Sequence, residues 1–79
     1  MSADVLREVC RVAADVFAVD AKTLHGASSP EQVDAWDSVQ HLNLVLALET
    51  QYGIQFAPEE MERMKDLAAI AALVRTKMS

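Results

Sequence analysis

The apolar residues of this chain recur at intervals of three and four residues, and this helical periodicity restricts its fold more than any other feature. No stretch alternates between apolar and polar residues for long enough to predict a strand. The 79 residues suffice for one domain, 1–79, with one modest hydrophobic core. We therefore predict an all-α fold: a four-helix bundle with a long loop between helices one and two and a short third helix.

The first helix is predicted from Ala3 to Phe17, with Ser2 as its N-cap and Asp4 in its first turn. A loop follows from Asp20 to Asp37, and it is longer than most connections in compact domains, which have about 4–6 residues. Loops of this length are often functional or carry anchors of their own. The residues expected to face the core are Val5, Leu6, Val9, Val12, Ala13, Val16 and Phe17 in the helix and Leu24, Val33 and Trp36 in the loop.

The second helix is predicted from Ser38 to about Tyr52. Asp37 is its N-cap candidate, and Gln40 three residues later gives a capping-box pattern. Gly53 is the residue type expected just past a helix end.

The third helix is predicted to begin at Pro58, since proline is favoured at the first helical position, and to run to about Met64. Asp66 is the predicted cap of the fourth helix. The core stripe of that helix consists of Leu67, Ile70, Ala71, Val74 and Met78.

The second helix carries two apolar strips, although a helix with one buried face needs only one. The arc expected to face the core contains His41, Leu44, Val45, Leu48 and Tyr52. The second apolar strip, roughly 130° away around the helix, consists of Val39, Leu42 and Leu46. Either this helix is buried all round, or it presents the second apolar strip to a partner; the small size of the bundle favours a partner.

Composition excludes several classes of protein. The net charge of −5 disfavours nucleic-acid binding, and no apolar stretch approaches the roughly 20 residues that span a bilayer. The single Cys10 cannot form an internal disulfide, and the N-terminus has no signal-peptide pattern, so we expect a cytoplasmic protein. His25, His41 and Cys10 match no zinc spacing, and no metal is expected. The ends at Met1 and Ser79 favour a free-standing protein over a piece of a synthase.

Ser38 lies between the two strips, at the start of the second helix. A phosphate attached there would face free backbone N–H groups and the positive end of the helix dipole. From the residues alone, however, a serine in this place is most often just a good helix starter. A hydrolytic triad of Asp37, Ser38 and His41 is disfavoured, because no second loop offers an oxyanion hole or a closed pocket.

The stretch from Asp37 to Glu49, followed by Tyr52-Gly53-Ile54, resembles the phosphopantetheine attachment region of acyl carrier proteins. The pattern of that family is Asp-Ser-Leu, then a helix of spaced aliphatic residues that ends in Leu-Glu and an aromatic residue. The order of the elements resembles the family over nearly the whole chain. Two features depart from it: Val39 replaces the usual leucine, and Glu49 is the only acid on a helix that is acidic in many fatty-acid carriers.

The resemblance implies a carrier that is not itself an enzyme. Ser38 would hold a covalent 4'-phosphopantetheine arm, with Asp37 beside it, and the arm would carry acyl groups as thioesters. The implied partners are a phosphopantetheinyl transferase and acyl-loading and acyl-processing enzymes, with the carrier acting as a monomer. The candidate docking residues are Val39, Leu42, Leu46, Glu59 and Glu60, and the candidate acyl-cleft residues are Leu44, Leu48, Met61, Met64 and Leu67.

Three questions stay open at this point. The pathway is fatty-acid, polyketide or other secondary-metabolite biosynthesis, and the few acids on the second helix favour a dedicated pathway. A carrier for an aminoacyl or aryl group is a near alternative, although such carriers often have a glycine-rich run before the serine. The alternative from another class is a small helical adaptor that binds partners through the second apolar strip and is never modified.

Overall fold

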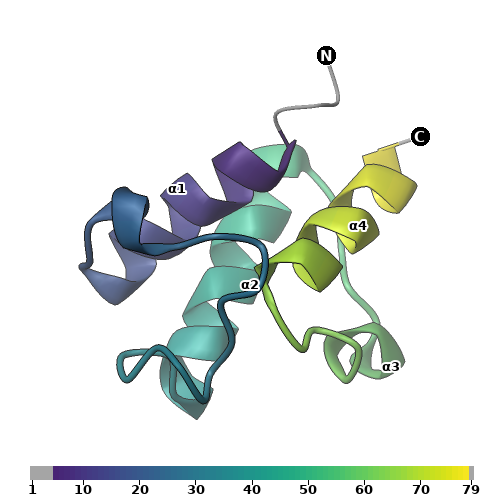
Figure 1. Cartoon of the computed structure of the whole chain (residues 1–79). Coiled ribbons are helices and arrows are strands. Elements are labelled where there is room, and N and C mark those ends of the chain that lie inside the picture. The colour runs from purple at the N-terminus through teal and green to yellow at the C-terminus, as the bar shows by residue number, and fades with distance from the viewer. Residues whose placement is uncertain (1–4, 79) are drawn as a thin grey trace.

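The computed structural model describes residues 5–78. These residues form α1 (Val5–Phe17), the 3₁₀ turn η2 (Ala21–Thr23), α2 (Ser38–Tyr52), α3 (Pro58–Met61) and α4 (Leu67–Met78) (Figure 1). No strand occurs among the described residues, so the all-α prediction is confirmed. The predicted cap Ser2 and the acidic Asp4 of the first turn lie outside them.

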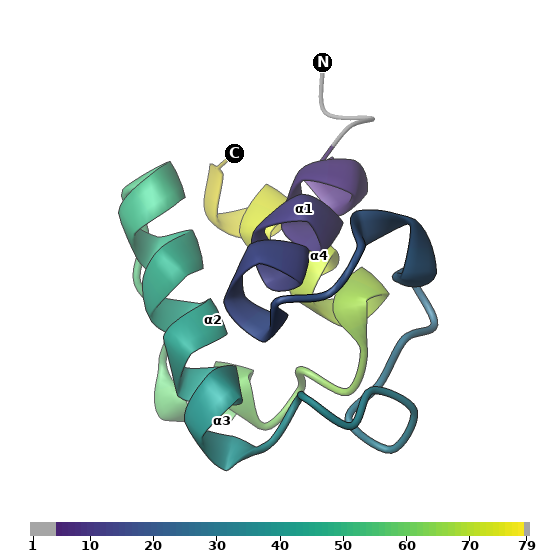
Figure 2. The same ribbon diagram turned by 90° about the vertical axis from the view of Figure 1, so that its left-hand side faces the viewer.

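The core lies where α1 packs against both α2 and α4 (Figures 1 and 2). The predicted stripe of α1 is confirmed, with Val9 and Ala13 fully buried, and it extends further round the helix than expected, to Cys10 and Ala14. Seven large side chains are almost completely buried: Val9, Leu44, Val45, Leu48, Leu67, Ile70 and Val74. The core is therefore built from three helices.

The long loop is fastened to the start of α4. Backbone N–H groups of Leu67 and Ala68 donate to the carbonyl oxygens of Ser28 (3.1 Å) and Gly26 (2.9 Å). These bonds satisfy donors that the first turn of a helix leaves without intrahelical partners. A Cβ on Gly26 would lie 3.3 Å from the Cβ of Ala68, so the close approach favours glycine. The predicted loop anchors are confirmed: Leu24 and Trp36 are buried, and Val33 packs against the core.

Both predicted ends of α2 are confirmed. Asp37 Oδ1 accepts from the backbone N–H of Gln40 at 2.9 Å, and Gly53 ends the helix in the left-handed conformation (φ 64°, ψ 39°). The reciprocal half of the predicted capping box is wrong. Gln40 Oε1, which would accept from the Asp37 N–H in a capping box, instead accepts from Asn43 Nδ2 at 2.9 Å. Gln40 Nε2 donates to the Val16 carbonyl of α1 at 3.1 Å, so the side chain joins two helices.

The third helix is shorter than predicted: α3 begins at Pro58 but ends at Met61 instead of about Met64. The following N–H groups of Arg63 and Met64 bond three residues back, to Glu60 and Met61, which winds the chain into tighter turns. Met64 is buried as a result. The predicted cap of α4 is confirmed, because Asp66 Oδ1 accepts from the N–H of Ala69 at 2.8 Å. The predicted stripe of α4 is confirmed except at Met78, which is the last residue of the helix and is 53% exposed.

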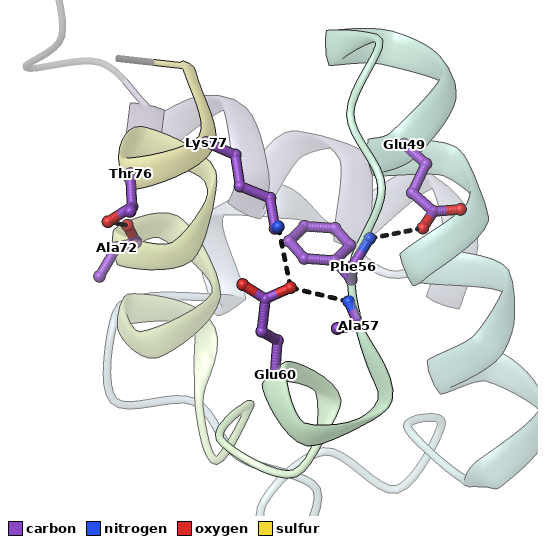
Figure 3. Close-up of polar contacts among 7 residues, drawn as sticks. All are labelled: Glu49, Phe56, Ala57, Glu60, Ala72, Thr76 and Lys77. Atoms are coloured by element: carbon purple, nitrogen blue, oxygen red, sulfur yellow. Dashed lines mark hydrogen bonds and ion pairs between the residues drawn. The ribbon is translucent and has the colours of Figure 1, made fainter.

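Charged side chains hold the connection between α2 and α3 in place (Figure 3). Glu49 of α2 accepts from the N–H of Phe56 at 2.8 Å. Glu60 of α3 accepts from the N–H of Ala57 at 2.7 Å and pairs with Lys77 Nζ of α4 at 2.8 Å. The short α3 is thus tied to the end of α4.

Candidate functional site

Ser38 is the first residue of α2 and is exposed. The start of α2 lies at the end of the molecule opposite the start of α1 and the end of α4 (Figure 2). Asp37 fixes the turn before the serine by capping Gln40, so the hydroxyl stands on a rigid helix end rather than on a mobile loop. Free N–H groups and the positive end of the helix dipole make this position favourable for a phosphate ester.

A groove of about 650 Å³ opens beside Ser38. It brings together the long loop, the first turns of α2 and the segment after α3. Its lining residues are Pro30, Trp36, Asp37, Ser38, His41, Leu42 and Met64. The site therefore combines an accessible hydroxyl with a mainly apolar surface next to it.

Trp36 connects this groove to the core. The indole is only 3% exposed, and its ring centroid lies 5.3 Å from that of Phe17 of α1. Trp36 Nε1–H also donates to His41 Nδ1 at 3.0 Å, and the two ring planes are 18° apart with their centroids separated by 6.0 Å. The sequence predicted a loop anchor at Trp36 and a partly buried His41 near the site, but nothing in it indicated the bond between them.

The bond with Trp36 determines the state of the His41 ring. Partial burial lowers the pKa of His41 below its ordinary 6.5, which favours the neutral imidazole. Because Nδ1 accepts a hydrogen bond, the proton of the neutral ring is on Nε2. His41 therefore offers an N–H donor in the wall of the groove.

The Asp37, Ser38 and His41 side chains do not form a hydrolytic triad. The Asp37 carboxylate caps the helix, and His41 Nδ1 accepts from Trp36. A triad would instead need the carboxylate to hold the imidazole. Among residues 5–78, no group of three or more His, Cys, Asp and Glu side chains could hold a metal ion.

The second apolar strip is open to solvent. Val39, Leu42 and Leu46 are 67%, 55% and 59% exposed, so α2 is not buried all round. On the opposite arc Leu44, Val45 and Leu48 are buried as predicted, while His41 and Tyr52 are half-buried. Apolar side chains of this size on one exposed helix face are typical of a binding surface.

The structure separates the predicted acyl-cleft residues into two groups. Leu44, Leu48 and Leu67 have no exposed surface and belong to the packed core. Met61 is half-buried, and Met64 is the one member of the set that lines the groove beside Ser38. The lining of an acyl cleft stays a prediction.

The two predicted acidic docking residues also differ. Glu59 is exposed, whereas Glu60 is half-buried and bonded to Ala57 and Lys77. The backbone bond from Ala57, followed by the bond to Lys77, lowers the pKa of Glu60. No pattern in the sequence indicates these structural roles of Glu49 and Glu60, because both depend on segments that meet only in the fold.

Comparison with known proteins places these features in a family. A curated acyl carrier protein of Thermosynechococcus vestitus (strain NIES-2133 / IAM M-273 / BP-1) is 30% identical over 77 residues, which cover 96% of this chain and 94% of the relative. The solution NMR structure of a holo acyl carrier protein from Geobacter metallireducens superposes with a TM-score of 0.87 at 35% identity. The match covers 95% of this chain and 86% of that one. No protein-family model matches the sequence.

In both comparisons the similarity extends over nearly the whole of this chain. The chain belongs to the acyl carrier protein family, which confirms the resemblance found in the sequence. Within the described residues, no helix is both long and apolar enough to cross a membrane.

Proposed function

We propose that this protein carries 4'-phosphopantetheine on Ser38 and presents acyl groups to partner enzymes without catalysing a reaction itself. The observation that supports this most strongly is the exposed Ser38 on a capped helix end, between the groove and the second apolar strip. The similar structure from Geobacter metallireducens is of a holo carrier.

The surroundings of Ser38 fit the attachment of such an arm. In a phosphopantetheinyl transferase, Ser38 Oγ would attack the pyrophosphate of coenzyme A. An Oγ–P bond forms, the P–O bond to the leaving 3',5'-adenosine diphosphate breaks, and the hydroxyl proton passes to a base of the transferase. Once attached, the arm supplies a thiol that holds acyl groups as thioesters, while the chain supplies position and recognition.

The second apolar strip is the proposed docking surface for the transferase and for acyl-loading and acyl-processing enzymes. Glu49, the only acid of α2, is bonded to Phe56. The face that a partner would meet on this helix is therefore apolar and weakly charged, with Asp37 and Glu59 as exposed acids nearby in the chain. This favours a carrier for a dedicated polyketide or other secondary-metabolite pathway over one that docks on strongly basic fatty-acid synthase enzymes.

We further propose that the carrier acts as a monomer in the cytoplasm. Cys10 is the only cysteine; it is buried, and burial raises the pKa of its thiol. A buried thiol with a raised pKa is a poor partner for a disulfide to a second copy.

Intact-mass analysis after incubation with coenzyme A, magnesium and a broad-specificity phosphopantetheinyl transferase tests the proposal. Wild type and a Ser29→Ala control should each gain one arm, and Ser38→Ala should gain none. A folded wild type that gains no arm, or a Ser38→Ala variant that gains one, would contradict it.

An unmodified adaptor is the second candidate function, and the exposed second apolar strip favours it. An adaptor would bind its partners equally well with Ser38→Ala and would gain no arm. A carrier for aminoacyl or aryl groups would gain the arm as an acyl carrier does. Assays of the modified protein with acyl-loading and aminoacyl-loading enzymes would distinguish these two carriers.

A further inference from the structure

The groove beside Ser38 has a mainly apolar lining that includes the imidazole of His41, and the proposed carrier function does not by itself explain this lining. Resting on that function, we propose that the groove seats the first part of the phosphopantetheine arm, the pantoyl unit next to the phosphate, and that His41 Nε2–H donates a hydrogen bond to an oxygen of that unit.

Connectivity selects the pantoyl unit as the occupant. The arm is bonded to Ser38 Oγ, and Ser38 itself lines the groove. His41 is three residues further along α2, so the two side chains are neighbours on the helix surface. The atoms just past the phosphate reach this groove without the arm doubling back, whereas the distal thiol would have to fold over the whole arm to enter it.

The chemistry of the lining matches the chemistry of that unit. Pro30, Trp36, Leu42 and Met64 provide apolar surface for the two geminal methyl groups of the pantoyl carbon. The secondary hydroxyl and the amide carbonyl beside those methyl groups are hydrogen-bond acceptors. His41 supplies the matching donor, because its Nδ1 is already bonded to Trp36 and its Nε2 carries the proton.

The Nε2–H group is available for such a bond. Within the described residues, no hydrogen bond to His41 Nε2 is formed. Every fully buried side-chain nitrogen or oxygen in the described part of the chain has a partner, so Nε2 must retain contact with the groove or with solvent. An accessible N–H group can exchange a water molecule for an acceptor on the arm.

Trp36 acts here as a positioning residue. It is held by Phe17 and the core on one side and bonds His41 on the other. It thereby fixes both the orientation and the tautomer of the imidazole. The attached end of the arm would then lie along the protein surface, while its thiol end stays available to partner enzymes.

Isotope-filtered NMR on ¹³C,¹⁵N-labelled holo protein with an unlabelled arm tests the proposal. We expect nuclear Overhauser effects from the geminal methyl protons of the arm to Trp36 and Met64, and a shift of the Trp36 Nε1–H signal between apo and holo protein. Complete modification by intact mass must be established first. Failure to gain the arm would refute the proposed function. Complete modification without these nuclear Overhauser effects would refute only the proposal that the groove binds the pantoyl unit.

Two variants of one residue sharpen the test. His41→Gln keeps an acceptor for Trp36 and a donor for the arm, and it should retain the contacts. His41→Phe keeps an aromatic ring without nitrogen and should lower the equilibrium constant for docking of the arm about fivefold, the effect of losing one neutral hydrogen bond. Equal contacts in the two folded variants would overturn the role of His41. A shift of the wild-type His41 Nε2 signal without any methyl contacts would mean that the phosphate is its partner, which would overturn the pantoyl seat.

Discussion

The two ends of α2 are held in different ways. At the C-terminal end, Tyr52 donates to Glu8 of α1 at 2.6 Å, and Glu49 accepts from Phe56. At the N-terminal end, Asp37 caps Gln40, the hydrogen bond between Trp36 and His41 connects the helix to the core, and Ser38 and Val39 stay exposed. The end without a reactive group is thus tied to neighbouring segments through Glu8 and Glu49, while the other end keeps Ser38 exposed beside the groove.

A substitution on the buried face of α2 should have the largest effect on the free energy of unfolding. Leu48→Ala removes a side chain with no exposed surface, so it should lower the free energy of unfolding by about 2–5 kcal/mol. Leu46→Ala on the exposed face of the same helix should change it by less than about 0.5 kcal/mol. Urea denaturation of both variants measures the difference. Equal effects would mean that the buried and exposed faces of α2 are assigned wrongly.

Glu49→Ala should weaken the C-terminal end without affecting modification. It leaves the N–H of Phe56 without its acceptor, which should cost about 1–3 kcal/mol. The exposed Glu59→Ala is the matched control and should change stability by less than about 0.5 kcal/mol. Denaturation and the initial rate of arm transfer are measured on both. A Glu49→Ala variant that folds normally but is modified slowly would place Glu49 in docking instead.

Asp37→Ala, at the N-terminal end of α2, should affect transfer of the arm more than it affects stability. Loss of the cap on Gln40 should cost about 0.5–2 kcal/mol, and transfer of the arm to Ser38 should slow more than this instability explains. Transfer rates are compared at a temperature where both proteins are folded. An Asp37→Ala variant that is unfolded at that temperature would show that the cap role dominates.

The two ends should respond to opposite extremes of pH, with the smallest effects on stability. The pKa of His41 is lowered from 6.5 in the folded state, so the unfolded chain binds more protons and stability falls as the pH drops from 6.5 through the folded pKa. The pKa of Tyr52 is raised from 10.0 to about 12, mainly by burial and then by Glu8, so stability falls as the pH rises from 10 toward 12.

Fluorescence of the single tryptophan, Trp36, reports the response of His41 to acid pH. Protonated His41 cannot accept from Trp36, so the fluorescence of Trp36 should change as His41 titrates. The chain has a second imidazole, the exposed His25, and His41→Gln is therefore the control, since it should remove the transition. A transition that persists in His41→Gln would assign it to another group.

The sequence predicted most of what depends on local patterns. The cap at Asp37, the end of α2 at Gly53 and the buried and exposed faces of that helix all follow from residue type and helical spacing. The end of α3 could not be predicted in this way. Met64 reaches the core because the chain after Met61 forms tighter turns instead of a further turn of α-helix.

The contacts that shape the site were less predictable. Trp36 and His41 are five residues apart and meet only because the loop turns into the helix at Asp37. Gln40 fits a capping box by pattern, yet its Oε1 accepts from Asn43 and its Nε2 donates to the carbonyl of Val16 on a neighbouring helix. Such bonds depend on how the elements pack, which no spacing in the sequence encodes.

Fragmentation mass spectrometry of the modified protein tests the central claim most directly, because it places the added mass on one residue. The account predicts that a peptide spanning the start of α2 carries the phosphopantetheine mass and that the fragment ions assign it to Ser38. An added mass on another serine, or none on a folded protein treated with an active transferase, would contradict it.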